Sequence, residues 1–359
     1  MDPITAPAAA GLASRIIGWV LQLVGLRRRG REEDRIAVID SYERRIKLAE
    51  EQIEAAQTDR ERDRLRSKVE DIRGRFDEYL EQIVRERTPA GAVKGEPSRL
   101  PAGELEELRA AINSLSALHT AQTFGEHFLR GNAFYQVRAF NKALEEYNAA
   151  LQLKPDDPIV LNNLGVTLDE LARYDEALAD HNRALELSPD YPEILSNRGM
   201  TLRKLERYDD ALADFSRSLE LRPDDPVTLN NRGVTLGYLQ RYDEALADFN
   251  RSLELRPGHP DTFGDRGVTL GALERHEEAL ADYNRSLELT PDDPDTLYNR
   301  ACVYSRMGQI EKSLDDLKEA ISRDAKYRAM AHEDEDFDNL RSDPEFGPEF
   351  ERLVAEPEE

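Results

Sequence analysis

The sequence predicts an all-α protein in which pairs of helices stack into a solenoid, preceded by a long helical hairpin or coiled coil and by an N-terminal hydrophobic helix. The first observation behind this fold class is a repeat, because glycine, alanine and proline each recur every 34 residues. The second is the spacing of apolar residues by three and four, which one face of a helix requires. The third is the composition: 39% hydrophobic and 34% charged residues are typical of helical arrays that bury one face only.

The composition of the 359-residue chain excludes several classes of protein. One cysteine rules out a disulfide scaffold and a four-cysteine zinc site, and six scattered histidines argue against a histidine metal centre. The formal net charge of -24 disfavours nucleic-acid binding, since phosphates need Lys and Arg. The chain holds no nucleophile-elbow, phosphate-loop or H-E-x-x-H motif. We therefore expect no enzyme, no cofactor, no metal and no nucleic-acid partner.

Residues 1–30 hold an apolar stretch that ends in a basic cluster. A helix over residues 8–26 would be about 28 Å long, close to a hydrocarbon core of about 30 Å. A membrane-spanning helix, a helix lying on an anionic membrane surface and a helix packed on protein all fit this pattern. The basic cluster would keep the rest of the chain on the cytoplasmic side, with a cytosolic protein as the alternative. The expected membrane residues are Ile16, Ile17, Trp19, Val20, Leu21, Leu23, Val24, Leu26, Arg27, Arg28 and Arg29.

Residues 31–88 are highly charged and carry two runs of apolar residues at helical spacing. Between the runs, residues 58–61 read TDRE, a capping box that would start a new helix. The pattern predicts two long helices folded back as a hairpin, or a continuous coiled coil with a phase break. Either seam is narrow, so we expect a homo-oligomer formed through residues 1–88. Residues 89–103 predict a linker, and residues 104–123 a lead-in helix.

Residues 124–327 contain six repeat units of two helices each. In the fourth, Leu229, Gly233 and Leu236 share one face of the first helix, and Pro257 ends the second helix because proline cannot continue the hydrogen-bond ladder. The repeated glycine and alanine would lie where the two helices cross closely. The residues in phase are Gly131, Gly165, Gly199, Gly233 and Gly267; Ala143, Ala177, Ala211, Ala245 and Ala279; and Pro155, Pro189, Pro223, Pro257 and Pro291.

These units resemble the tetratricopeptide repeat (TPR) family, whose pattern combines Leu-Gly with later Ala, aromatic, Ala and Pro positions. The second unit supplies Leu161, Leu164, Gly165, Leu168, Ala177, His181, Ala184 and Pro189. The sixth departs, with Ala301, Ser313 and Ala325 in place of glycine, alanine and proline. The resemblance implies a right-handed superhelix whose first helices line a concave groove for a protein or peptide.

One groove position carries an amide or a carboxylate in five successive units. A primary amide offers a donor and an acceptor, so a row of amides can hold the backbone of an extended peptide. The row is similar to the asparagine ladder of O-linked N-acetylglucosamine transferases, while the alternative is that the amides bridge neighbouring helices. The family's dicarboxylate clamp is not expected, because Phe128 stands at the clamp lysine position. The expected peptide-binding residues are Asn163, Asn197, Asn231, Asp265 and Asn299, with Val166, Met200, Val234 and Val268 beside them.

Two further rows of charged residues follow the repeat. Arginine precedes the glycine position in units three to six, and aspartate recurs on the second helices. We interpret the two rows as ion pairs between packed helices, with an arginine row that binds an acidic ligand as the alternative. The rows are Arg198, Arg232, Arg266 and Arg300, and Asp214, Asp248, Asp282 and Asp316.

Residues 328–359 form an acidic tail that allows two interpretations. Its carboxylates have the spacing of a calcium-binding hand, but Asn339 replaces the glycine that makes the sharp turn. The tail also resembles the closing segment of bacterial TPR arrays, whose apolar residues cover the last helix, and we favour this interpretation. The carboxylates are Asp334, Asp336, Asp338 and Glu345, and the covering residues are Phe337, Leu340 and Phe346.

The sequence as a whole predicts an adaptor or scaffold. Its helical array would bind a protein or peptide, and its N-terminal helices would tether it to a membrane or oligomerise it. One alternative is a membrane effector whose N-terminal helix assembles into a pore, with the repeats as sensor. Another is a soluble cytosolic scaffold.

Overall fold

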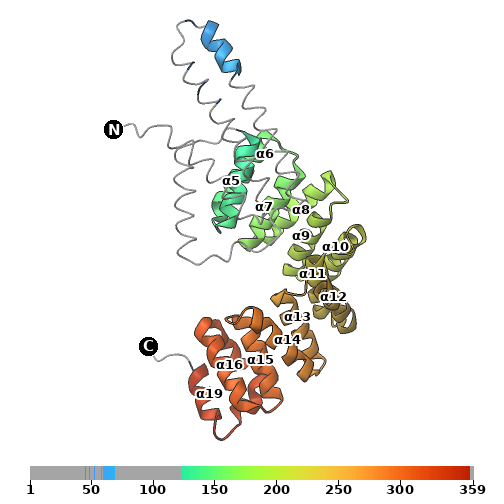
Figure 1. Cartoon of the computed structure of the whole chain (residues 1–359), viewed down its shortest axis with the longest axis vertical. Helices are drawn as coiled ribbons and strands as arrows, with labels where there is room; N and C mark the ends of the chain where they lie inside the picture. The colour runs from blue at the N-terminus through green and yellow to red at the C-terminus, as the bar shows by residue number, and fades with distance from the viewer. Residues whose placement is uncertain are drawn as a thin grey trace, which may run out of the picture. The chain divides into compact units, whose positions relative to one another are not determined.

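The computed structural model describes residues 45, 48, 52, 58, 60–68 and 123–355. Every regular element within these residues is a helix, so the all-helical part of the predicted fold is confirmed for them (Figure 1). The predictions for residues 1–30, 89–103 and 104–122 fall outside the described residues. Of the predicted hairpin, residues 60–68 are helical, and the hydroxyl of Thr58 accepts a hydrogen bond from the Glu61 backbone N–H at 3.2 Å.

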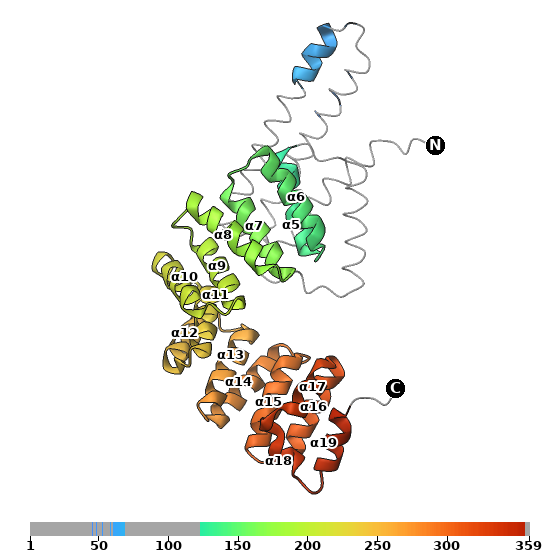
Figure 2. The same cartoon turned by 180° about the vertical axis from the view of Figure 1, so that it is seen from behind.

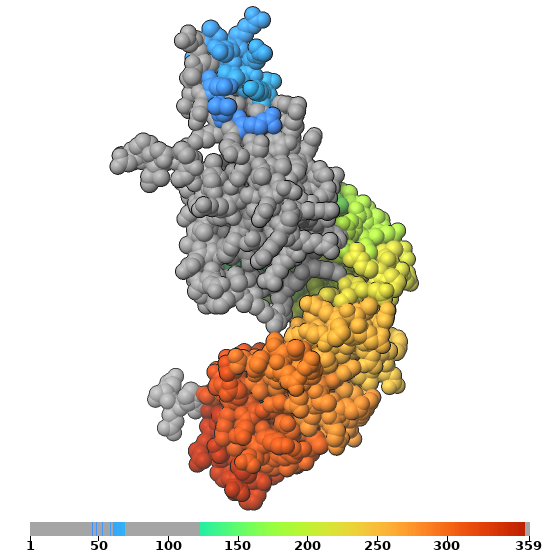
Figure 3. Space-filling model, in the orientation of Figure 1, coloured from blue at the N-terminus to red at the C-terminus, as the bar shows by residue number. Residues whose placement is uncertain are grey.

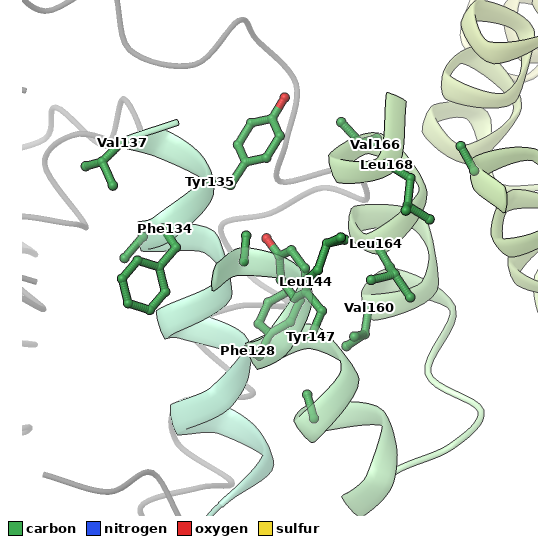
Figure 4. Close-up of a cluster of buried hydrophobic side chains, with 14 of the residues drawn as sticks. Phe128, Phe134, Tyr135, Val137, Leu144, Tyr147, Val160, Leu164, Val166 and Leu168 are labelled. Atoms are coloured by element: carbon green, nitrogen blue, oxygen red, sulfur yellow. The ribbon is translucent and has the colours of Figure 1, made fainter. Parts of the chain in front are cut away.

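The chain divides into two compact units, Met1–Leu205 and Glu206–Glu359. The described helices of the first unit form the pairs α5/α6 and α7/α8, followed by α9. In their core, Phe128 of α5 and Tyr147 of α6 lie at the centre, with Val160 of α7 beside them (Figure 4). The bounds are α5 (Phe124–Gln136), α6 (Phe140–Leu153), α7 (Pro158–Glu170), α8 (Tyr174–Leu187) and α9 (Pro192–Lys204).

The second unit begins with α10 and continues through three helix pairs, α11/α12, α13/α14 and α15/α16. Figure 2 shows these pairs from behind, and Figure 3 shows the packed orange and red surface of α13 to the C-terminal helices. The bounds are α10 (Tyr208–Leu221), α11 (Pro226–Tyr238), α12 (Tyr242–Leu255), α13 (Pro260–Ala272), α14 (His276–Leu289), α15 (Pro294–Arg306) and α16 (Ile310–Arg323).

Proline and the turn residues explain why the helices begin and end where they do. Each first helix from α7 onward has proline at its first position, where the missing N–H costs nothing and the fixed φ suits a helix. Each second helix from α6 to α14 ends two residues before a repeat proline, as predicted. The turns after the first helices each contain one residue with φ between 56° and 70°, a conformation that glycine adopts most easily. Only Gly308 supplies glycine there among the described turns, and the others use Arg138, Ala172, Glu206, Gln240 and Glu274.

The repeated glycine lets a ring from the second helix approach the first helix closely. A Cβ atom on Gly233 would lie 2.7 Å from Cε1 of Phe249, and one on Gly267 would lie 2.6 Å from Cε1 of Tyr283. The repeated alanines are fully buried beside these contacts. The predicted close crossing of paired helices is therefore confirmed.

The tail folds onto the last helix pair, as the closing-segment interpretation predicted. Phe337 and Leu340 are fully buried against α15 and α16, and Phe346 packs at the edge of the same cluster. Two of the four carboxylates of the alternative calcium hand take separate ion pairs, Asp336 with Arg306 and Asp338 with Arg341. The elements are α17 (Lys326–Glu333), η1 (Glu335–Phe337), α18 (Asp338–Arg341) and α19 (Gly347–Val354).

Candidate peptide-binding surface

The predicted groove residues lie at equivalent positions on the first helices of five repeat units. Within each helix the amide or carboxylate and the apolar residue are three positions apart, so they share one face. They are Asn163 and Val166 on α7, Asn197 and Met200 on α9, Asn231 and Val234 on α11, Asp265 and Val268 on α13, and Asn299 on α15.

In the first compact unit, Met1–Leu205, the amides of this row form hydrogen bonds between neighbouring helices. Asn163 Nδ2 donates to Asn132 Oδ1 of α5 at 3.0 Å, and Asn197 Nδ2 donates to Asn162 Oδ1 of α7 at 2.9 Å. A buried amide is stabilised by such bonds, because an unpaired polar group away from water is costly. The bridging interpretation therefore describes this unit. Of the predicted residues in this compact unit, Asn163, Asn197 and Val166 are buried, and Met200 is partly exposed.

In the second compact unit, Glu206–Glu359, the side chains of the same row are more exposed. Asn230 Nδ2 of α11 donates to Asp265 Oδ2 of α13 at 2.8 Å, which repeats the bridge once. Gly264 takes the position of Asn230 in the next repeat and has no side chain, so Asn299 makes no bond of this kind. The side chain of Val268 is 48% exposed. The partly exposed members are Asn231, Val234, Asp265 and Asn299.

Sequence reasoning missed one residue of this surface, Tyr238. It lies four positions after Val234, on the same face of α11, and its side chain is 60% exposed. Its ring stacks on that of Tyr208 with centroids 5.1 Å apart. The helical spacing from Val234 was the signal that could have found it. We call Asn231, Val234, Tyr238, Asp265, Val268 and Asn299 the first-helix surface.

Aspartates of the second helices bind three members of the arginine row. Arg232 Nε and Nη2 donate to the two carboxylate oxygens of Asp248, each at 2.7 Å. Arg266 and Arg300 make the same bidentate pairs at 2.6–2.7 Å. For these three arginines the ion-pair interpretation is confirmed, and their partners are Asp248, Asp282 and Asp316.

In the first compact unit, the first repeat has an equivalent ion pair and the second repeat lacks the arginine. At the equivalent positions of the first repeat, Arg130 Nη2 pairs with Glu146 Oε1 at 2.7 Å. In the second repeat Leu164 replaces the arginine, and Asp180 keeps the acidic position. Burial raises the pKa of Asp180 to about 6, an effect that His181 opposes and Glu176 reinforces. A carboxyl group without its arginine is thus harder to ionise.

Three side chains near the tail could be considered as metal ligands. Ligand atoms of Cys302, Asp334 and Asp336 lie within 4.8 Å of one another. However, Asp334 Oδ2 accepts a hydrogen bond from the Tyr298 hydroxyl at 2.6 Å, and Asp336 pairs with Arg306 at 2.7 Å. Burial raises the pKa of the Cys302 thiol, with help from the two carboxylates, so the thiolate that binds metals is disfavoured. These contacts describe an anchor for the tail.

The predicted membrane residues between Ile16 and Arg29 lie outside the described residues. Within the part of the chain that the structure describes, none of the helices combines the length and the apolar character needed to cross a bilayer.

Family models match the chain over a continuous stretch. Three of them, described as tetratricopeptide repeat, match residues 190–258 and 224–292, residues 272–342 and residues 158–191. A fourth, described as TPR repeat, matches residues 131–171. Together they cover more than half of the sequence, and the chain belongs to the tetratricopeptide repeat family. Proteins of this family are generally scaffolds for protein interactions and typically are not enzymes.

Solved structures of TPR proteins are similar to this chain. A tetratricopeptide repeat protein from Parabacteroides merdae is 18% identical, with a TM-score of 0.52 over 77% of this chain and 98% of that chain. YrrB, described as a TPR protein with an unusual peptide-binding site, is 24% identical, with a TM-score of 0.41 over 53% and 98%. A thermophilic TPR protein from Thermus thermophilus is 22% identical, with a TM-score of 0.46 over 50% and 98%. No curated protein is similar enough to this chain to count as a match.

Proposed function

We propose that the protein is an adaptor that binds a peptide or protein partner on the first-helix surface of α11, α13 and α15. The observation that carries the proposal is the coincidence of exposed apolar side chains with a polar row on the same helix faces. Tyr238 and Val268 are 60% and 48% exposed, and they share helix faces with Asn231 and Asp265, respectively. Exposed apolar groups rimmed by polar ones are typical of binding surfaces.

The polar row supports binding of an extended segment. Asn231 and Asn299 each offer an amide donor and an amide acceptor, the pair that a peptide backbone complements. Three contiguous first helices carry the row, since α13 contacts both α11 and α15. The buried amides of the first unit are committed to helix bridging, so the proposal places the partner on the second unit.

We further propose that residues 1–88 attach the adaptor to the cytoplasmic side of a membrane or join copies of it. The support is the sequence alone: the apolar stretch before Arg27, Arg28 and Arg29, and the charged periodic segment in residues 31–88. A chain without membrane attachment would be a cytosolic scaffold.

The test is site-specific photo-crosslinking of the full-length protein in its native cells. A photo-reactive residue at position 268 should crosslink a discrete set of partners. The matched control carries it at Leu289 on α14, which is 37% exposed and lies on a second helix. Crosslinking at 268 should fall when Asn231 and Asn299 are both changed to Ala. Equal crosslinking at both positions, or a partner set that the double change leaves intact, would contradict the proposal.

A further inference from the structure

We propose that the second repeat, in the first compact unit, binds an arginine side chain of a partner protein. In this arrangement the carboxylate of Asp180 on α8 accepts two hydrogen bonds from the guanidinium group, and the amide oxygen of Asn148 on α6 accepts a third. The site uses none of the residues of the first-helix surface. It therefore goes beyond the proposed function and can fail independently of it.

The first observation is that the array already binds this chemical group at equivalent positions. Arg266 Nε and Nη2 donate to the Asp282 carboxylate at 2.7 and 2.6 Å, and Arg266 Nη1 donates to Asn250 Oδ1 at 2.6 Å. Arg300 makes the same three bonds, at 2.6–2.7 Å, to the equivalent aspartate and asparagine of its own position. An aspartate on one second helix and an asparagine on the preceding second helix can therefore hold one guanidinium group together.

The second observation is that the second repeat keeps both acceptors but lacks the arginine. Asp180 and Asn148 take the positions of that aspartate and asparagine, and Leu164 takes the position of the arginine. A leucine side chain ends at its δ carbons, so it supplies none of the donating nitrogen atoms. Leu164 is buried, whereas Asp180 is partly exposed and Asn148 is exposed. A donor from another molecule can thus reach the two acceptors from solvent.

The third observation is that both acceptors are free. Within the part of the chain that the structure describes, neither Asp180 nor Asn148 makes a side-chain hydrogen bond or an ion pair. The neighbouring carboxylate of Glu176 is bound by Arg173 at 2.6–2.7 Å. The Asp180 pKa of about 6 leaves its carboxylate mostly ionised at neutral pH. A partly buried charge without a partner gains more from a cation than a fully solvated charge does, because the local dielectric constant is lower.

The geometry of the acceptors selects arginine over lysine. A guanidinium group presents its N–H donors in a rigid, planar fork that matches the two oxygens of a carboxylate. A further nitrogen of the same group remains for the asparagine, as Arg266 shows. The ammonium group of lysine is a point charge without this fork, so it would lose the bidentate contact.

The repeat supplies a variant that fills the site from within the chain. Leu164→Arg introduces the residue that five other repeats carry at this position, so we expect it to fold and to occupy Asp180. Asp180→Asn removes the charge at constant size. Asp175→Asn removes one charge from an exposed position of the same helix and is the matched control. The five equivalents of Leu164 are Arg130, Arg198, Arg232, Arg266 and Arg300.

The experiment is selection of a displayed random dodecapeptide library on the full-length wild type and on Leu164→Arg in parallel. We expect arginine to be enriched in the peptides that only the wild type selects. For such a peptide, Asp180→Asn should weaken binding about tenfold, as loss of a charge-assisted bond does. Asn148→Ala should weaken it several-fold, and Asp175→Asn should leave it unchanged. Replacing the arginine of the peptide by lysine should weaken binding to the wild type but not to Asp180→Asn, where no bidentate pair forms.

The outcomes separate this inference from the proposed function. Circular dichroism checks that Leu164→Arg folds, and if it does not, Asp180→Asn takes its place in the parallel selection. Identical peptides from wild type and variant, or wild-type peptides without arginine, would overturn the inference. Peptides that depend on Val268 and are indifferent to Asp180→Asn would overturn it while supporting the first-helix surface.

Discussion

Asp180 shows how the loss of one partner changes the energetics of a repeated residue. Its equivalents Asp248, Asp282 and Asp316 each bind an arginine, whereas Leu164 takes the position of that arginine in the repeat of Asp180. Its pKa of about 6 in the folded protein exceeds the ordinary value of 3.8. The folded state therefore binds the proton more tightly, and the stability that this group contributes is lost as pH rises from about 4 through about 6.

We predict that Asp180→Asn stabilises the protein by about 1 kcal/mol at neutral pH, a figure reduced for solvent screening of a partly exposed group. The gain should vanish below about pH 3, where the carboxyl of the wild type is protonated in both the folded and the unfolded state. Urea unfolding followed by circular dichroism across this pH range measures the difference. A wild type and variant with parallel pH profiles would contradict the raised pKa.

The equivalent change in an intact pair should have the opposite sign. Asp248→Asn leaves Arg232 without its bidentate carboxylate in a site where Asp248 is 6% exposed. We predict a loss of about 1–3 kcal/mol at neutral pH, since a group that loses its charged partner keeps its desolvation cost. The same urea experiment compares the two variants directly. Equal effects of Asp180→Asn and Asp248→Asn on the free energy of unfolding would mean that Arg232 contributes nothing to stability.

Two glycines in first helices of the second unit should also respond oppositely to alanine. At Gly233 the new methyl group would lie 2.7 Å from Phe249, and overpacking of this kind costs about 1–3 kcal/mol. At Gly271 the nearest atom is 3.7 Å away, so Gly271→Ala should gain up to about 1 kcal/mol from helix propensity. Thermal unfolding of the two variants checks the sign of each stability change. Stabilisation by Gly233→Ala would show that the Phe249 ring can move away from the new methyl group.

At the scale of elements, the closing tail protects the end of the array. The Phe337 ring lies 5.5 Å from Tyr298 and 5.8 Å from Phe350, centroid to centroid, and Phe337 is fully buried. We predict that Phe337→Ala costs about 3–5 kcal/mol of local stability. Because each repeat contacts only its neighbours, hydrogen exchange should rise in α15 to α19 and not in α11. Met330→Ala, at a side chain 48% exposed, is the control that should change nothing. Uniform loss of protection along the unit would contradict a local cap.

The helix pairs were predictable from sequence because their determinants are local. Period, proline position and the glycine–ring contact all recur within 34 residues, and each pair repeats the same chemistry. The binding surface was less predictable. Asn163 and Asn231 look alike in the sequence, yet Asn163 is buried and bonded to Asn132, while Asn231 is partly exposed. Tertiary contacts decide this difference, and a residue's repeat position does not encode them.

At the scale of the whole molecule, charge separates the repeats from the N-terminal segment. Residues 103–359 carry 29 basic and 54 acidic residues, whereas residues 1–102 carry 20 and 19. An acidic array is repelled by an anionic bilayer, so any membrane attachment must come from the N-terminal residues. The adaptor proposal thus divides its two tasks between two chemically different parts of one chain.

This division predicts the behaviour of the full-length protein with anionic phospholipid vesicles. The intact chain should sediment with them, and a chain lacking residues 1–30 should not. If the helix lies on the surface, changing Arg27, Arg28 and Arg29 to Ser should weaken binding roughly 100-fold, since each basic residue near the surface contributes about 1 kcal/mol. If the helix spans the bilayer, attachment should survive both that change and high salt. Vesicle leakage that depends on residues 1–30 would instead support the membrane effector, and an intact chain that stays in the supernatant would remove the membrane from the proposal.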